Sequence, residues 1–246
     1  MPKAATEERS KRKRFSTQEK PTKRRRSSSA SDESEDPNAK ILLMEQGILE
    51  SRKNYNDITV LLSTANDFKK GEPESMLATV ALCRIFVRLL TQGALISKKS
   101  LSEKDLVVVG WLKEQFGEFK KTLLAMLRDE ELAPTALTLC MRTLKAEGQF
   151  MYDKEEYIFP RAFHRDIMES LLMSENEDAS KVYIEEFAEQ YDDIRYFTFS
   201  SVKYVIFTAS GQQSRLTFYL GTLWRSIQTI MLHQNSLIDA LRSCLL

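Results

Sequence analysis

Glycine and proline are scarce in this chain of 246 residues, with 8 and 6 copies. A β-sandwich or barrel needs turn residues every few positions, so this scarcity argues against those folds. Long helices need few such residues. The composition therefore favours an all-α protein before any pattern along the chain is considered.

Cysteine and histidine are also rare, which limits metal and redox chemistry. The three cysteines are Cys83, Cys140 and Cys244. They are odd in number, far apart and set in apolar sequence, so we expect reduced, buried thiols rather than a disulfide framework or zinc site. His164 and His233 have no Cys or His neighbour at metal-ligand spacing. His164 lies beside Arg165 and Asp166, and we predict it on a helix surface.

The sequence lacks the motifs of the common enzyme classes. It has no phosphate-binding glycine loop, no G-x-G-x-x-G turn and no G-x-S-x-G elbow. Acidic pairs such as Glu185-Glu186 and Asp192-Asp193 are typical of a solvated helix face, which leaves a carboxylate-pair hydrolase as a minor alternative. We predict no catalytic residue, no cofactor and no metal site, and therefore a protein that is not an enzyme.

Long hydrophobic runs are missing as well. The N-terminus is charged and lacks the apolar segment of a secretory signal. The apolar stretch from 216 to 232 is interrupted by Arg225 and is too short to span a membrane. We expect a soluble protein without membrane contact.

Charge is distributed unevenly, although the net charge is only +1. Residues 1–26 hold eleven Lys and Arg against three acids, residues 27–36 hold four acids and no base, and the remainder is mildly acidic. Residues 1–38 contain almost no large apolar side chains and cannot offset the entropy cost of ordering. We therefore predict a disordered basic and acidic tail over residues 1–38.

Two basic clusters in this tail are separated by eight residues. The clusters are Lys11, Arg12, Lys13 and Arg14, followed by Lys23, Arg24, Arg25 and Arg26. This spacing is typical of a bipartite nuclear-import signal, so we predict nuclear localisation and an import receptor as a partner. A general affinity for RNA and other polyanions is the open alternative. Ser29, Ser31 and Ser34 lie in the adjoining acidic block, and we predict them as phosphorylation sites that would tune the clusters electrostatically.

From Lys40 onward the apolar residues recur at spacings of three and four, which predicts helices. The predicted helices are Ile41 to about Leu62 with a break near Asn54–Asn56, Glu74–Leu90 capped by Gly93, Ser102 to about Arg128, one opened by Pro134, one opened by Pro160, and one carrying Tyr183, Phe187, Tyr191 and Ile194. Phe86, Trp111 and Phe119 are assigned to the core. The stretch from 196 to 207 could be strand or helix. Short polar loops between such helices predict an antiparallel stack, either a bundle or a HEAT-like solenoid.

Three lysine pairs lie where loops or helix exteriors are expected. They are Lys69-Lys70, Lys98-Lys99 and Lys120-Lys121. Hydration explains such pairs by default, and contact with the phosphates of rRNA is the alternative.

Several residue runs carry a family resemblance. They are ALCRIFVRLLTQG at 81–93, VGWLKEQFGEFKKTLLAML at 109–127, the Phe159-Pro160 helix start, and the acidic, aromatic segment 185–197. Together they resemble the N-terminal helical region of the nucleolar complex protein four family, whose members carry a CCAAT-binding-factor-type domain in the C-terminal half. The resemblance spans roughly residues 40–200 and consists of packing residues.

The resemblance implies a HEAT- or armadillo-like helical scaffold without enzymatic activity. It also implies a place in the nucleolus, partnership with nucleolar protein fourteen and other small-subunit factors, and a role in 90S pre-ribosome (small-subunit processome) assembly and rRNA processing. The domain that would hold this partner is expected beyond residue 246. A nuclear adaptor in transcription or chromatin, with no ribosomal role, is the alternative function.

The expected organisation has three parts. Residues 1–38 form the tail with its import signal, and residues 39–200 form the helical-repeat domain. Residues 201–246 form an atypical C-terminal segment that departs from the family, as a truncated or aberrant chain would.

Overall fold

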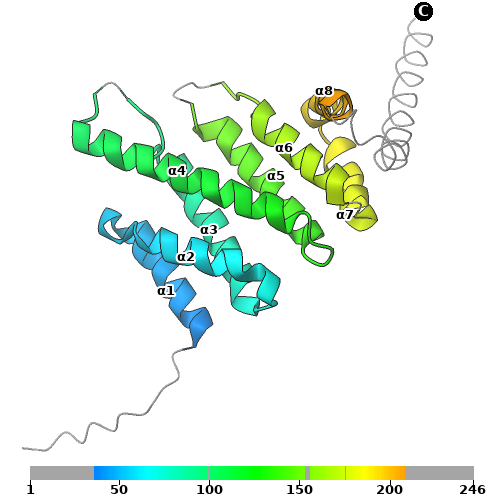
Figure 1. Cartoon of the computed structure of the whole chain (residues 1–246). Coiled ribbons are helices and arrows are strands. Elements are labelled where there is room, and N and C mark those ends of the chain that lie inside the picture. Colours follow the sequence, from blue (N-terminus) through cyan, green and yellow to red (C-terminus); the bar gives the residue numbers. More distant parts are fainter. Residues whose placement is uncertain (1–35, 99, 153–155, 175, 209–246) are drawn as a thin grey trace, which may run out of the picture. The chain divides into compact units, whose positions relative to one another are not determined.

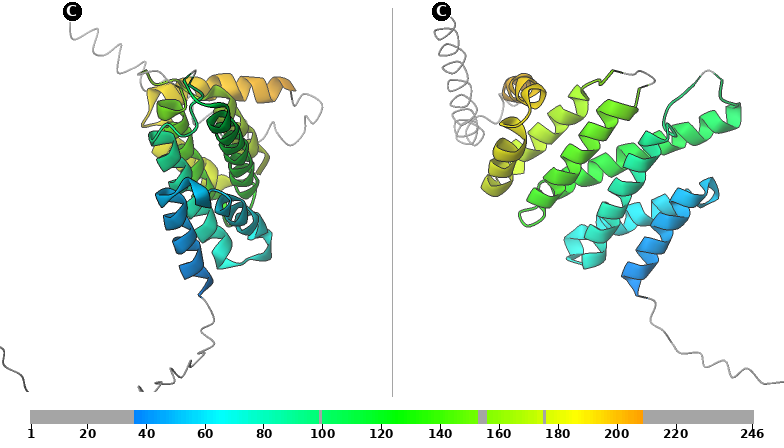
Figure 2. Two further views of the ribbon diagram at one scale, coloured as in Figure 1. Left: turned by 90° about the vertical axis from the view of Figure 1, so that its left-hand side faces the viewer. Right: turned by 180° about the vertical axis from the view of Figure 1, so that it is seen from behind.

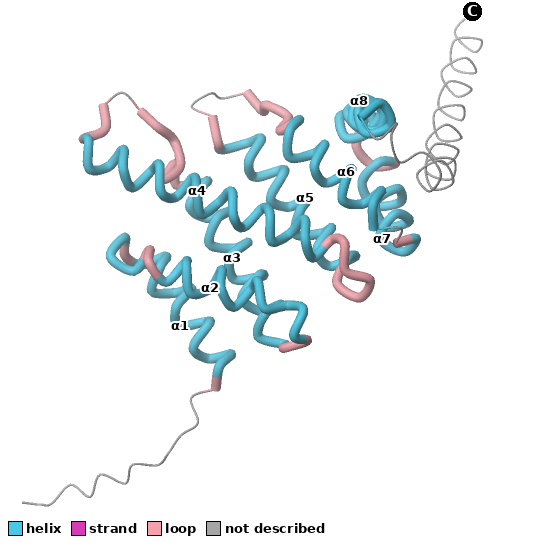
Figure 3. Tube along the Cα trace, viewed as in Figure 1, coloured by secondary structure: helices cyan, strands magenta, loops and turns pink. Residues whose placement is uncertain are grey.

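The computed structural model describes residues 36–98, 100–152, 156–174 and 176–208. The chain divides into two units at residue 35, and all of these residues belong to the second. Their regular structure is helical, and Figures 1 and 3 show no strand among them. The α-helices are α1 (Pro37–Glu50), α2 (Asp57–Asn66), α3 (Pro73–Thr91), α4 (Glu103–Met126), α5 (Ala133–Phe150), α6 (Arg161–Ser174), α7 (Glu177–Val182) and α8 (Asp192–Thr208). Three shorter helical turns are η1 (Arg52–Asn54), η2 (Asp67–Lys70) and η3 (Tyr183–Ala188).

Helices that lie two apart in the sequence pack against each other, which produces two layers. One layer runs α1, α3, α5 and α7, and the other runs α2, α4, α6 and α8. Contacts between consecutive helices, such as α2 with α3 and α4 with α5, hold the two layers together (Figures 1 and 2). This alternation is the architecture of a helical solenoid, so the predicted all-α solenoid is confirmed.

The helix boundaries follow the signals in the sequence. The Ser102 hydroxyl accepts a hydrogen bond from the Asp105 N–H at 3.2 Å and so caps α4, as predicted. Gly93 follows α3 with φ of 70°, and the Ala94 N–H donates to the Leu89 carbonyl at 2.9 Å. This pattern is a glycine-dependent helix end. The predicted caps at both positions are confirmed.

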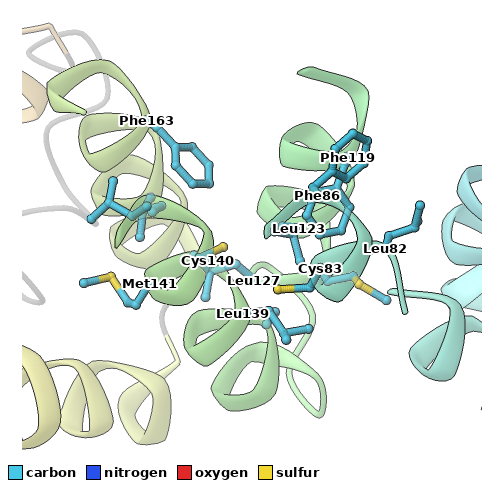
Figure 4. Close-up of a cluster of buried hydrophobic side chains, with 14 of the residues drawn as sticks. Leu82, Cys83, Phe86, Phe119, Leu123, Leu127, Leu139, Cys140, Met141 and Phe163 are labelled. Carbon is cyan, nitrogen blue, oxygen red and sulfur yellow. The ribbon is translucent and has the colours of Figure 1, made fainter. Parts of the chain in front are cut away.

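The core joins the two layers through an aromatic cluster. Phe86 on α3 is fully buried, and its ring centroid lies 5.2 Å from that of Phe116 and 5.3 Å from that of Phe119, both on α4. Figure 4 shows Phe86 and Phe119 side by side. Cys83 and Cys140 are free and buried in the same core, and burial raises the pKa of both thiols. The assignment of Phe86 and Phe119 to the core is confirmed, and half-buried Trp111 packs against its edge.

The prediction of one continuous helix after the α6 segment is wrong. Tyr183, Phe187, Tyr191 and Ile194 do not share one helix, because α7 passes into the π-helical turn η3 and a new helix begins at Asp192. The side chain of Asp193 accepts a hydrogen bond from the Ile194 N–H at 2.8 Å, which favours a helix start there. The segment 196–207, left open between strand and helix, is helical, and α8 continues past residue 200 to Thr208.

Gly148 on α5 allows the loop before α6 to lie against that helix. The Ile158 N–H donates to the Gly148 carbonyl at 3.0 Å. A Cβ on Gly148 would lie 2.5 Å from Cε2 of Tyr157 and 2.9 Å from the Ile158 carbonyl oxygen. We predict that Gly148→Ala lowers the free energy of unfolding by about 1–3 kcal/mol, because the loop must move away from α5. Urea denaturation measures the change.

Gly110 on α4 is the matched control. No atom lies within 4 Å of a Cβ built there, so Gly110→Ala gains helix propensity without a clash. It should raise the free energy of unfolding by about 0.5–1 kcal/mol. If both substitutions shift stability in the same direction, the close approach at Gly148 is not what limits that position.

Candidate protein-interaction surface

His164 is buried, so its predicted place on a helix surface is wrong. Its Nδ1 lies 3.0 Å from Oγ of Ser201, and its Nε2 lies 3.0 Å from the hydroxyl of Tyr183. That hydroxyl lies 2.6 Å from Oγ1 of Thr198. Burial lowers the pKa of His164 from 6.5 to about 4, so the imidazole is neutral at physiological pH. The charged neighbours Arg165 and Asp166 favour an exposed position in the sequence, but the side chain of His164 lies on the buried face of α6 and contacts η3 and α8.

This polar network joins α6, η3 and α8, and each ring nitrogen of His164 has a hydroxyl partner inside the protein. Such a satisfied network positions helices instead of presenting a base to a substrate. In the described ranges, no three His, Cys, Asp or Glu side chains gather closely enough to hold a metal ion.

A groove of about 860 Å³ lies between α4, α6, α8 and the loop that joins α5 to α6. We call it the central groove. Phe159 and Phe197 line it, with stacked rings whose centroids are 4.0 Å apart. The ring of Tyr157 meets Phe159 edge-on at 6.4 Å, and Tyr157 itself lies over Gly148. The close approach of loop and helix at Gly148 thus shapes this groove.

Lys120 and Glu147 form the wall of the central groove on the side of α4 and α5. The ammonium of Lys120 donates to both carboxylate oxygens of Glu147, at 3.0 and 3.1 Å. It also lies 4.8 Å from the ring centre of Phe116 and 5.0 Å from that of Phe163. The prediction of Lys120 on a helix exterior is therefore wrong, since this side chain is held between helices. Its neighbour Lys121 is exposed and pairs with Glu118 at 2.8 Å.

Two further grooves adjoin the central one. The α6–α8 groove, of about 400 Å³, shares Arg161 and Phe197 with it. The α5–α8 groove, of about 450 Å³, shares Tyr157 and Asp193 with it. Exposed tyrosines line the three grooves, and they are Tyr152, Tyr157, Tyr191, Tyr196 and Tyr204. Tyrosine and arginine are, with tryptophan, the side chains that most often anchor protein interfaces, so this surface is suited to protein contact.

The sequence contains one signal for this surface, which is the clustering of its tyrosines. Six of the eight tyrosines lie between residues 152 and 204. Helical periodicity predicts Tyr183 and Tyr191 alike on one helix and does not distinguish them, whereas in the structure Tyr183 is buried and Tyr191 is exposed. The clustering of tyrosines marks this region, but only the three-dimensional structure separates its core tyrosines from its surface ones.

The residues predicted to act in import and regulation lie outside the described part of the chain. They are Lys11, Arg12, Lys13, Arg14, Lys23, Arg24, Arg25 and Arg26 of the basic clusters, and Ser29, Ser31 and Ser34 of the acidic block. Their roles stay predictions. Among the described helices, none has the length and apolarity needed to cross a membrane.

Known proteins share most of this helical region. The family model described as "Nucleolar complex protein 4-like, TPR repeats" matches residues 30–213. An uncharacterized protein of Schizosaccharomyces pombe is 31% identical over 169 residues, covering 66% of this chain and 34% of that protein. The nucleolar complex protein 4 homolog of Danio rerio is 29% identical over 174 residues (64% and 32%). Its Mus musculus counterpart is 26% identical over 205 residues (76% and 38%).

Fold and surface together define a helical-repeat protein with two layers of helices and a grooved face lined by exposed tyrosines. The chain belongs to the nucleolar complex protein 4-like family, whose repeats are described as the TPR type. The resemblance noted in the sequence is thereby confirmed. The chain spans about a third of the length of these curated relatives.

Proposed function

We propose that the protein is a nucleolar scaffold of ribosome biogenesis that acts through protein contacts and without catalysis. The observation that carries this proposal is the family match over residues 30–213, which covers the whole described solenoid. The names of the Danio rerio and Mus musculus relatives place those proteins in a nucleolar complex. The tyrosine-lined grooves supply a surface on which such a complex can assemble.

More specifically, we place the protein in assembly of the small subunit, within the 90S pre-ribosome, and in rRNA processing. Nucleolar protein fourteen is the proposed partner, together with other small-subunit factors. Contact with the rRNA backbone is a secondary element of this proposal. The lysines available for it include exposed Lys121 but exclude Lys120, which is engaged with Glu147.

Affinity purification of the tagged chain from nucleated cells tests the function directly. We expect mass spectrometry to recover small-subunit pre-ribosomal proteins and sequencing to recover precursor rRNA. A matched chain in which the eight Lys and Arg of the two basic clusters are replaced by Gln should stay in the cytoplasm and lose both. Recovery of import receptors together with transcription or chromatin factors, without pre-ribosomal proteins, would contradict the ribosomal role and favour a nuclear adaptor.

A further inference from the structure

Two arginines of α6 are held against aromatic rings in the α6–α8 groove. The Cζ atom of Arg161 lies 4.9 Å from the ring centre of Phe197, and that of Arg165 lies 4.6 Å from the ring centre of Tyr204. Phe197, which contacts Arg161, also stacks on Phe159. Stacking fixes a guanidinium plane and reduces the entropy that it loses when it binds a carboxylate or phosphate.

Both guanidinium groups retain the capacity to bind an anion. In the described part of the chain, no carboxylate pairs with Arg161 and none lines the α6–α8 groove. Arg165 approaches Asp166 only at 3.9 Å, which is longer than a hydrogen bond. These two arginines therefore differ from Arg84, whose guanidinium is held by two hydrogen bonds to Glu45.

The spacing of the two arginines suits a peptide. Residues four apart on a helix lie on the same face, about 5–6 Å apart. Alternate side chains of an extended peptide point the same way and are separated by about 6.6 Å, twice the rise per residue. Two acidic side chains at positions i and i+2 can thus meet Arg161 and Arg165 together.

The surroundings favour a peptide over a nucleic acid. Residues 161–208 contain ten Asp and Glu but only five Lys and Arg. This field favours a ligand whose negative charge is confined to the two arginines, and it disfavours a nucleic acid, which carries a phosphate at every nucleotide. Aromatic faces that could stack on bases are partly taken, since Phe197 stacks on Phe159 and also contacts Arg161. Tyr196, by contrast, lines the groove, is 67% exposed, and can cover an incoming backbone.

We propose that the α6–α8 groove binds a short extended acidic segment of a partner protein, with Arg161 and Arg165 each receiving one carboxylate. The arginines supply the charge, and Tyr196 and Tyr204 supply the apolar contact around it. This inference deepens the proposed scaffold function by giving the chemistry of one partner.

A binding assay with the purified full-length chain tests this proposal without reference to ribosome assembly. The probe is a fluorescein-labelled ten-residue peptide of Ser and Gly that carries Glu only at positions 5 and 7, with both ends blocked. The chain carries Gln in place of the eight Lys and Arg of the basic clusters, because that tail would bind the probe non-specifically. Fluorescence anisotropy should show saturable binding. Arg161→Gln and Arg165→Gln should each weaken it about tenfold, as expected for the loss of a charged hydrogen bond.

The matched control is Arg128→Gln, which removes the same charge from an exposed position outside the groove and should leave binding unchanged. Arg161→Lys keeps the charge but loses the planar fork, so it should also weaken binding. Equal binding by the Arg161→Gln/Arg165→Gln double variant and its parent would overturn the proposal, and so would absence of binding. Stronger binding of a ten-nucleotide uridine oligomer that depends on the same arginines would assign the groove to RNA. Because the assay uses purified protein, its result stands apart from the recovery of pre-ribosomal factors.

Discussion

Replacing Phe86 with Ala is expected to lower the free energy of unfolding by about 3–5 kcal/mol. Phe86 is fully buried and comes from the layer that contains α3, whereas its ring partners Phe116 and Phe119 come from α4 in the other layer. Removing the ring would leave a cavity where the layers join, and the rigid helices on either side cannot close it completely. Chemical denaturation followed by circular dichroism measures the loss.

Leu43→Ala is the control for this substitution. Leu43 on α1 is 69% exposed, so its truncation should change stability by no more than about 0.5 kcal/mol. The slope of unfolding free energy against denaturant should stay the same in both variants, since the unfolded surface is similar. An unchanged midpoint for Phe86→Ala would show that the aromatic cluster does not hold the layers together.

Acidification from pH 6.5 towards pH 4 is expected to destabilise the protein through His164. The pKa of His164 is about 4 in the folded protein and 6.5 in the unfolded chain, so the unfolded chain binds the proton first. The free energy of unfolding therefore falls as the pH falls through this window. The stabilising contribution of neutral His164 is complete above pH 6.5. The difference in pKa corresponds to about 3 kcal/mol at pH 4.

His164→Gln separates this contribution from the other titrating groups. Glutamine is uncharged at every pH, and its shorter amide group cannot make both of the hydrogen bonds that His164 makes with Tyr183 and Ser201. The variant's free energy of unfolding at pH 7 should therefore be about 1–3 kcal/mol lower than that of the parent. Its stability should then fall less steeply than that of the parent between pH 6.5 and 4. The measurement is a set of urea titrations at closely spaced pH values. Parallel pH profiles for parent and variant would show that protonation of His164 does not cause the loss of stability at low pH.

Much of the solenoid was predictable from local patterns. The hydroxyl cap at Ser102, the left-handed glycine at position 93 and the break near Asn54 each follow from a single residue type in a local setting. Core membership of Phe86 also follows from spacing alone. These features depend on neighbours within one helical turn, which is the range over which sequence patterns are informative.

The wrong predictions share a different cause. The break between η3 and α8 carries neither glycine nor proline, and its apolar spacing runs on unbroken through Tyr191. The positions of Lys120 and His164 depend on partners that are distant in sequence, namely Glu147 for the former and Tyr183 with Ser201 for the latter. The candidate grooves likewise combine elements that are distant in sequence, such as α4 with α8 in the central groove and α5 with α8 in the α5–α8 groove. No local pattern contains such information, because each contact is decided by how the layers stack.

The two-layer arrangement also bears on how the chain reaches its folded state. Each within-layer contact joins a helix to the next but one, so in the described region no helix must wait for a distant part of the chain. A topology of this kind has low contact order and allows folding to begin while the chain emerges from the ribosome. Once α3 has been synthesised, α1 and α2 already have their main neighbour. Each later helix then adds to a surface that already exists, so that synthesis itself can order the assembly of the stack.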